Sequence, residues 1–514
     1  MRNQMFLGYL LAVMFTSSMA TAQEFQFADV IERARTLAES PYQAPEPAPQ
    51  FLSDLSYDEY RDIRFRPEAS LWRGGKSGFE VMLMAPGSYY GHAVTIHEID
   101  AEGVRALQFD KNDFSYPNDS FAKRIPADLG YSGFKLTFPL DDQTGQDQFL
   151  VFAGASYFRG VGEGNQFGLS GRGIAIDTGL SSGEEYPAFT QFWLERPGAG
   201  AGSMVVYALL DGPSVTGAYR FVVKPGATTR LDVKARLFFR DGVSMLGLAP
   251  LTSMFYYGEN TPRPAGEWRP QVHDSDGLLV HDGMTGEWLW RPLINPRTLR
   301  MSFLQATDIR GFGLIQRDRA FHHFEDAEAR YDQRPSAWVE PVGDWGKGEV
   351  VLVEIPTRGE TNDNVVAFWH PAENIEAGQD LELAYRLYFG GEGTVSQPGA
   401  RAQNTFVGDG NRIGGGSVDN GLRIVVDFAG GELADVAPDA AVVSDVSGSE
   451  DVEVLEHYVE YLPAKEAWRL SMLLRPSADA PLVARAFLRL GDRALTETWT
   501  YELPAQTGIR GPTK

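Results

Sequence analysis

Short β-forming runs separated by turns recur through most of this chain, and this pattern constrains the fold more than any other feature. The runs are rich in β-branched and aromatic residues, and Gly, Pro or Asp bounds many of them. Helices do not alternate with strands, which argues against doubly wound α/β folds and TIM barrels. The pattern therefore predicts an all-β protein built on a large antiparallel β-sandwich. The runs are residues 79–83, 93–99, 133–138, 149–153, 189–194, 203–210, 219–223 and 229–239.

A glycine-rich segment, residues 390–421, divides the β-rich sequence in two. It has few large apolar residues, and this composition is typical of linkers and mobile loops. Several short strands over roughly 100 residues are typical of an immunoglobulin-like sandwich. We therefore predict one domain over residues 23–389 and an immunoglobulin-like domain over residues 422–514. Apolar and polar residues alternate again in the second part, at residues 422–428, 468–474 and 499–503.

The N-terminal segment, residues 1–22, has the pattern of a secretory signal. Arg2 supplies the positive charge, residues 5–15 are almost entirely apolar, and Ala20 and Ala22 form a small-x-small cleavage site. A buried N-terminal helix is the alternative for this segment. No later stretch of about 18 apolar residues follows, so we expect the processed protein not to span a membrane. An exported chain without cysteine fits the bacterial periplasm.

Two local patterns beyond the signal predict helices. Apolar residues at helical spacing over residues 27–39 predict a short amphipathic helix. Ser56 followed by Glu59 has the spacing of a capping box, which predicts a further helical turn.

The charge balance and the missing cysteines exclude several classes of function. The chain has 46 Lys and Arg residues against 69 Asp and Glu residues, a net charge of −23. This excess of negative charge argues against nucleic-acid binding and against docking on anionic lipid. The lack of cysteine excludes disulfides, zinc–thiolate sites and thiol nucleophiles. His322 and His323 have no third ligand at a suitable spacing, so we predict neither a metal nor a cofactor.

Aromatic and acidic residues gather in one part of the sequence. Six of the ten tryptophans lie there, together with several histidines and many carboxylates. A sugar ring stacks on an aromatic face, and its hydroxyls need charged or amide partners. The cluster as a whole favours a carbohydrate site, whereas for any single Trp a place in the sandwich core is the favoured interpretation. The tryptophans are Trp268, Trp288, Trp290, Trp338, Trp345 and Trp369.

Two acidic clusters lie within this region. The first contains Asp274 and Asp276, and the second contains Glu360 and Asp363 in a polar turn between two apolar runs. Each cluster fits a turn capped by its own Asp and Asn side chains. The chemical alternative is a carboxylate pair for glycoside cleavage, in which one carboxylic acid protonates the leaving oxygen and one carboxylate activates water. A like-charged neighbour raises the pKa of an acid, and Glu360 beside Asp363 would supply that charge.

Seven motifs are spread over nearly the whole predicted mature chain. They are GASYFR at 154–159, GLSGRGIAIDT at 168–178, PLTSMF at 250–255, HDSDGL at 273–278, WLWRPL at 288–293, RYDQRPSAW at 330–338 and ETNDN at 360–364. In these motifs the chain resembles the periplasmic glucan biosynthesis proteins of the osmoregulated periplasmic glucan system. It is more similar to the G type than to the D type, because no twin arginine precedes the apolar run of the export signal.

The resemblance implies a fold and an activity. The fold would be an N-terminal β-sandwich of the galactose-mutarotase-like kind joined to a C-terminal immunoglobulin-like domain. The activity would be that of an anomer-inverting glycoside hydrolase on β-1,2-linked glucan, with Asp363 as the general acid and Asp274 as the general base. Tyr331 and Glu360 match positions that line the sugar subsites. Asp276 is the alternative base, because its motif offers two carboxylates.

We extend the predicted sugar contacts to four residues of the motifs and of the aromatic cluster: Trp290, Arg291, Trp338 and Trp369. Two other functions stay open on the sequence. The first is a transglycosylase at the same site, which differs from a hydrolase only in subsite shape and water access. The second is a glucan-binding scaffold without catalysis, whose partner would be the inner-membrane glucan synthesis machinery.

Overall fold

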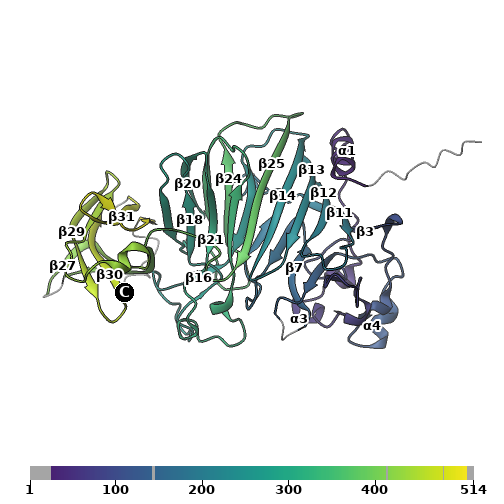
Figure 1. The fold of residues 1–514 in the computed structure, drawn as a ribbon, viewed down its shortest axis with the longest axis horizontal. Coiled ribbons are helices and arrows are strands. Elements are labelled where there is room, and N and C mark those ends of the chain that lie inside the picture. The colour runs from purple at the N-terminus through teal and green to yellow at the C-terminus, as the bar shows by residue number, and fades with distance from the viewer. Residues whose placement is uncertain (1–24, 142–144, 413–414, 478–479, 506–514) are drawn as a thin grey trace, which may run out of the picture.

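The computed structural model describes residues 25–141, 145–412, 415–477 and 480–505, so the predicted export signal lies outside the described residues. Figure 1 shows that β-sheets make up most of the molecule, with a few short helices around them. The prediction of an all-β sandwich protein is confirmed. The C-terminal strands lie at one end of the long axis, and helix α1 (Phe27–Ala38) lies toward the other.

Two large sheets form the main sandwich. The 10-stranded sheet has the order β2–β6–β7–β8–β9–β15–β24–β23–β20, with β10 paired to β15. The 15-stranded sheet has the order β28–β31–β33–β19–β18–β21–β22–β25–β14–β13–β12–β11–β3–β4, with β32 paired to β31. Two of its strand pairs, β3 with β11 and β19 with β33, are parallel.

The strands of the 10-stranded sheet are β2 (Glu80–Met84), β6 (Gly133–Phe138), β7 (Asp147–Ala153), β8 (Tyr157–Gly160), β9 (Ser170–Arg172), β10 (Ile174–Ile176), β15 (Leu246–Ser253), β20 (Arg300–Thr307), β23 (Lys347–Glu354) and β24 (Val365–Pro371). Those of the 15-stranded sheet are β3 (Thr95–Asp100), β4 (Gly103–Ala106), β11 (Ala188–Glu195), β12 (Met204–Asp211), β13 (Val215–Lys224), β14 (Thr228–Phe239), β18 (Gly277–His281), β19 (Trp288–Pro292), β21 (Gly311–Ile315), β22 (Ser336–Pro341), β25 (Asp380–Gly390), β28 (Val443–Gly448), β31 (Leu482–Leu490), β32 (Arg493–Ala494) and β33 (Thr498–Leu503).

Aromatic side chains from both sheets fill the space between them. Phe152 of β7 lies 5.7 Å from Phe192 of β11, and Phe158 of β8 lies 5.3 Å from Phe221 of β13, measured between ring centroids. All four rings are buried. Burying such a side chain contributes about 1.5–3 kcal/mol to folding. Successive side chains of a strand point to opposite sides of the sheet, and these four rings lie on the inner faces.

The C-terminal strands form a second, smaller sandwich, and one of its layers continues the large sheet. A 4-stranded sheet of order β26–β27–β30–β29 packs against β28, β31 and β33 over a separate core. Strand β33 pairs with β19, so that Trp499 lies opposite Trp290. The remaining strands are β26 (Arg401–Asn411), β27 (Ser417–Ala429), β29 (Val452–Leu462), β30 (Ala467–Pro476), and the short pairs β1 (Arg64–Phe65) with β5 (Phe114–Ser115) and β16 (Phe255–Tyr257) with β17 (Val272–His273).

Strand β26 and the start of β27 lie in residues 390–421, which the sequence predicts as linker and loops. The two strands pair with each other, with Asp409 opposite Leu422. A Cβ atom added at Gly410 would lie 2.7 Å from the Cα of Gly421. The expectation of loop structure is therefore wrong for these residues, because some of the glycines here allow paired strands to approach closely.

Helix α1 covers the outer face of the large sheet, and its bounds match the helix predicted for residues 27–39. Val30 and Ala34 of this helix are buried against Trp193 and Tyr207. The capping box predicted at Ser56 is also present, because its hydroxyl accepts a hydrogen bond from the N–H of Glu59 at 3.3 Å.

The other helices are α2 (Gln50–Ser53), α3 (Tyr57–Tyr60), α4 (Asp119–Arg124), η1 (Pro67–Ala69), η2 (Lys111–Asp113), η3 (Phe321–His323), η4 (Tyr331–Gln333) and η5 (Gly431–Asp435). Within the described ranges, none of the helices has the length and apolar character that crossing a lipid bilayer requires.

Candidate active site

Asp274 is hydrogen-bonded to the chain segment that directly follows strand β15, which ends at Ser253. It comes directly after β17, which pairs with β16 so that His273 lies opposite Phe255. The N–H of Asp274 donates a hydrogen bond to the carbonyl of Met254 at 2.8 Å. The side chain of Asp274 is nearly buried, with 7% of the residue exposed. The pairing of β16 with β17 thus fixes where this carboxylate stands.

Asp363 is held to the same segment through its neighbour Asn364, which forms hydrogen bonds with Phe255. It lies in the turn between β23 and β24, directly before Asn364. The side chain of Asn364 is buried, where its Oδ1 accepts from the N–H of Phe255 at 2.8 Å and its Nδ2 donates to the carbonyl of Phe255 at 3.1 Å. Residues 254 and 255 therefore anchor both acidic clusters, although the clusters are far apart in the sequence.

Charges connect the two aspartates. Arg159 of β8 lies 3.3 Å from Oδ2 of Asp363, and Arg334 lies 3.3 Å from Oδ1 of Asp274. Burial raises the pKa of Asp274, and the negative charge of Asp363 raises it further, whereas Arg334, Arg159 and His273 oppose the rise. Asp363 itself is open to solvent. The structure thus brings an exposed and a buried carboxylate into electrostatic contact.

The two candidate bases differ in how their oxygens are used. Oδ2 of Asp276 accepts hydrogen bonds from the backbone N–H groups of Arg317 and Asp318, the latter at 2.8 Å. Oδ1 of Asp274 is buried and has no hydrogen-bond donor within the described residues, since Arg334 approaches it without hydrogen-bond geometry. Buried acceptor atoms usually have a hydrogen-bond donor, so one without a donor needs an explanation. Asp274 is therefore free to accept a proton, whereas Asp276 is occupied within the fold.

Tyr331 and Glu360 belong to one polar cluster beside Asp274. The hydroxyl of Tyr331 donates a hydrogen bond to Oε2 of Glu360. Arg269 donates to the same carboxylate at 2.6 Å and also contacts Asp326 at 3.0 Å. Burial, followed by the carboxylate of Glu360, raises the pKa of Tyr331 well above its usual range, so the hydroxyl stays a donor. Both predicted subsite residues thus lie together, next to the candidate base.

The other four residues predicted to contact sugar lie inside the protein. Trp369 is fully buried between the two large sheets. Trp290 and Trp338 belong to the second core, where the small sandwich packs, and the guanidinium of Arg317 covers Trp290 at 3.5 Å. Arg291 is buried as well and forms an ion pair with Glu502 at 2.9 Å. The expectation that these four side chains contact sugar is therefore wrong, because the sandwich cores bury them.

A further group of aromatic and charged residues includes Tyr157 of β8 and Arg172 of β9. Arg172 is buried between the rings of Tyr157 and Tyr186, at 5.1 and 5.3 Å, and forms an ion pair with Glu184 at 2.7 Å. The hydroxyl of Tyr186 donates to Glu184 at 2.9 Å. Tyr186 is 55% exposed, so its ring is available to a ligand.

Three arginines that hold the acidic residues in place were not predicted from the sequence. Arg159, Arg269 and Arg334 each contact one of the acidic residues of the site. Arg159 and Arg334 lie inside two of the seven motifs, which is the signal that would have indicated them. Within the described residues, no group of three or more His, Asp or Glu side chains is arranged to hold a metal ion.

Comparison with known proteins decides the family of this chain. The family model described as "Periplasmic glucan biosynthesis protein, MdoG" matches residues 25–503. The chain belongs to this family. All the residues of the candidate active site lie inside the matched span.

Relatives of this family member cover nearly its full length. "Glucans biosynthesis protein G" of Ralstonia nicotianae is 45% identical over 494 residues, which are 95% of this chain and 98% of the relative. The protein of the same name from Pseudomonas aeruginosa is 45% identical over 491 residues, 94% of this chain and 93% of the relative. That of Dickeya dadantii is 42% identical over 501 residues, 96% of each.

Proposed function

We propose that this family member acts in the periplasm, in the biosynthesis of osmoregulated periplasmic glucan. This proposal is supported by the relatives, which carry the name "Glucans biosynthesis protein G", and by the family model, which is described as that of a periplasmic glucan biosynthesis protein. We further propose that the substrate is β-1,2-linked glucan and that the reaction is inverting glycoside hydrolysis. The observation that carries the proposal is that an exposed Asp363, through its neighbour Asn364, and a buried Asp274 are both held by hydrogen bonds to residues 254 and 255, so that the charge of one raises the pKa of the other.

In the proposed reaction, Asp363 donates a proton to the glycosidic oxygen. Asp274 accepts a proton from the water that attacks the anomeric carbon from the opposite face. Inverting enzymes place their two carboxyl groups about 6.5–9.5 Å apart to leave room for this water, and farther if a second water or a hydroxyl relays the proton. The raised pKa of Asp274 suits a base, because a stronger base removes the proton from water more readily.

The residues around the pair would hold the glucan. The carboxylate of Glu360 and the hydroxyl oxygen of Tyr331, whose proton is donated to Glu360, offer acceptors to sugar hydroxyls, and Arg269 fixes the position of Glu360. The exposed ring of Tyr186, which lies over Arg172, offers an aromatic face. Sugar rings bind to such faces through their C–H groups, while charged partners set their orientation.

The test is incubation of linear β-1,2-glucan with the purified protein and with Asp363→Asn. We expect short oligosaccharides with new reducing ends from the wild type and none from Asp363→Asn, whose fold is checked by thermal unfolding. Asn362→Ala is the matched control, because this neighbour is exposed and takes no part in the proposed reaction.

Other outcomes decide between the alternatives. Full activity in Asp363→Asn would overturn the assignment of the general acid. Cyclised or rearranged glucan without new reducing ends would identify a transglycosylase. Polymer that is bound but unchanged by the wild type would identify a scaffold.

A further inference from the structure

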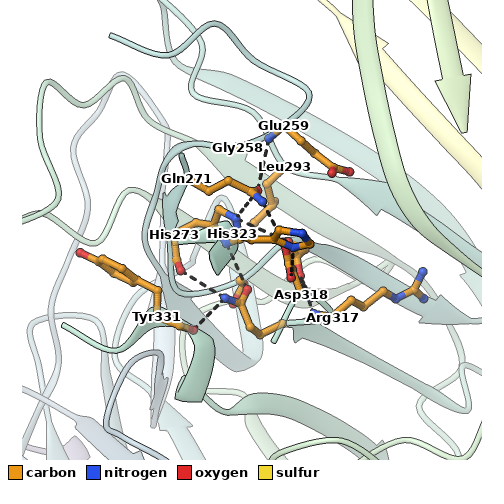
Figure 2. A network of polar contacts seen from close by, with 12 residues as sticks. Gly258, Glu259, Gln271, His273, Leu293, Arg317, Asp318, His323 and Tyr331 are labelled. Carbon is orange, nitrogen blue, oxygen red and sulfur yellow. Dashed lines mark hydrogen bonds and ion pairs between the residues drawn. The ribbon is translucent and has the colours of Figure 1, made fainter. Parts of the chain in front are cut away.

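A network of polar side chains surrounds His273, the residue directly before Asp274. Figure 2 shows this network, which includes Gln271, Asp318, His323 and the backbone of Tyr331. The ring of His273 is fully buried. Its Nδ1 lies 3.1 Å from Oε1 of Gln316, and its Nε2 lies 3.1 Å from Oε1 of Gln271. The protonation of His273 therefore depends on which way the two amide groups point.

The amide of Gln316 has only one favourable orientation. Its Nε2 donates to the carbonyl of Tyr331 at 3.1 Å and to the carbonyl of His273 at 3.4 Å. Turning the amide over would place its oxygen against two carbonyl oxygens, which carry no hydrogen to donate. The oxygen of Gln316 must therefore face Nδ1 of His273.

The amide of Gln271 is fixed in the same way from the other side. Its Nε2 donates to the carboxylate of Asp318 at 2.8 Å, and its Oε1 accepts from the N–H of Glu259 at 3.3 Å. Asp318 also lies 2.7 Å from Nδ1 of His323. Turning this amide over would place its oxygen against the carboxylate of Asp318. It would also place its N–H group against the N–H of Glu259. The oxygen of Gln271 must therefore face Nε2 of His273.

Both ring nitrogens of His273 thus face oxygen atoms that can only accept. A neutral imidazole has one N–H donor and one bare acceptor nitrogen, so it would leave one of these contacts without a proton. We infer that His273 is held as a doubly protonated, positively charged imidazolium, and that this charge is a positioning element for the neighbouring Asp274.

The surroundings of the ring fit a cation. Oδ1 of Asp276 lies 3.5 Å from Nε2 and supplies a negative partner. The ring of Phe255 is stacked on His273 at 5.4 Å, and Phe324 lies at 5.2 Å with its plane nearly perpendicular. Buried charges need partners of this kind, and aromatic faces attract cations.

The consequence for catalysis rests on the proposed function. Burial and Asp363 raise the pKa of Asp274, and His273 is one of the positive groups that lower it. The imidazolium therefore helps to keep the base ionised and ready to accept a proton. The other charged and titratable groups around the two residues are Asp276 and Asp318 on the His273 side and Arg334, Arg159, Asp363 and Tyr331 on the Asp274 side.

The direct test is nitrogen NMR of the full-length mature protein carrying isotope-labelled histidine. His273→Gln identifies the signal by its loss. We expect both ring nitrogens of His273 to show the shifts of protonated nitrogens, because both face acceptor oxygens. One nitrogen with the far-downfield shift of an unprotonated imidazole nitrogen would overturn the inference. This measurement needs no activity, so it stands apart from the proposed function.

The kinetic test concerns the acidic side of the pH profile for glucan cleavage. His273→Gln removes a positive charge near Asp274, so the acidic limb of kcat/KM should move to higher pH. His457→Gln, an exposed histidine of the small sandwich, is the matched control and should leave the limb in place. An unmoved limb in His273→Gln would contradict the positioning role, and an inactive wild type would contradict only the proposed function.

Discussion

The side chain of Asn364 forms hydrogen bonds with both the N–H and the carbonyl group of Phe255, at 2.8 and 3.1 Å. A third bond joins Asn364 to the carbonyl of Ile355 at 2.9 Å. Because Asn364 directly follows Asp363, these bonds fix the turn that presents the candidate acid. Met254, the residue directly before Phe255, accepts a hydrogen bond from the N–H of Asp274 at 2.8 Å.

Asn364→Ala should both weaken the fold and reduce glucan cleavage. The change leaves the N–H and carbonyl of Phe255 without partners in a buried place, which costs about 1–3 kcal/mol for each unsatisfied group. Calorimetry or urea unfolding measures the loss of stability, and kcat of the remaining folded protein should fall because Asp363 is no longer fixed. Asn362→Ala should change neither quantity. Wild-type kcat in folded Asn364→Ala would contradict the view that this turn positions the acid.

Arg269→Lys should weaken the binding of glucan. Arg269 forms a two-pronged contact with Glu267, with both distances 2.9 Å, and still reaches Asp326 and Glu360. A lysine ammonium cannot replace this planar fork. We expect KM for β-1,2-glucan to rise about tenfold with a smaller change in kcat, since a tenfold change corresponds to only about 1.4 kcal/mol. Arg263→Lys, at an exposed position, serves as the control, and an unchanged KM in Arg269→Lys would show that Glu360 needs no such support.

Trp369 should matter for stability and not for sugar binding. It is fully buried in the main core. Trp369→Ala should lower the free energy of unfolding by about 3–5 kcal/mol, as large-to-small changes in cores do. The milder Trp369→Phe should stay folded and bind glucan with wild-type affinity in calorimetric titration. A folded Trp369→Phe that loses glucan affinity would restore the interpretation of Trp369 as a sugar contact.

The stability of the protein should depend on pH through Glu259. Burial raises the pKa of Glu259 from 4.5 to about 8, and its carboxylate accepts from Asn404 at 2.8 Å and from the N–H of Thr405 in β26. Between these pH values the folded protein holds a proton that the unfolded chain releases. Glu259 therefore adds to the free energy of unfolding at low pH. This contribution disappears as the pH rises toward 8.

Glu259→Gln tests this dependence, because glutamine does not titrate. The wild type should lose on the order of 3 kcal/mol more than Glu259→Gln as the pH rises through this window. Urea unfolding at a series of pH values measures the difference. Equal slopes for the two proteins would mean that Glu259 titrates alike in the folded and unfolded states.

Short β-forming runs bounded by turn residues were enough to predict the β-rich fold. The bounds predicted for the strand at residues 133–138 agree with β6, and the helix predicted at residues 27–39 agrees with α1. Local patterns could not predict the pairing of β19 with β33, because Trp290 and Trp499 are far apart in the sequence and nothing local specifies a parallel partner. The same pairing explains why Trp290 is buried.

The sequence indicates where the polar residues of the candidate site lie better than where its aromatic residues lie. The turn residues Glu360 and Asp363 and the strand-end residue Asp274 lie at the surface or just beneath it, as polar residues between strands do. A tryptophan, in contrast, fits both a sugar site and a core, and for any single Trp the core is the favoured interpretation. Trp338 and Trp369 point to the inner side of their strands, and only the register of the strands decides that side.

The stereochemistry of the first product tests the central claim most directly. Proton NMR during the cleavage of linear β-1,2-glucan distinguishes the two anomers of the new reducing end before they interconvert. If Asp363 and Asp274 act as acid and base on either side of the bond, inversion of a β-linkage must release the α-anomer first, and Asp363→Asn must release none. A first product with the β-configuration, or no product from the wild type, would contradict the account.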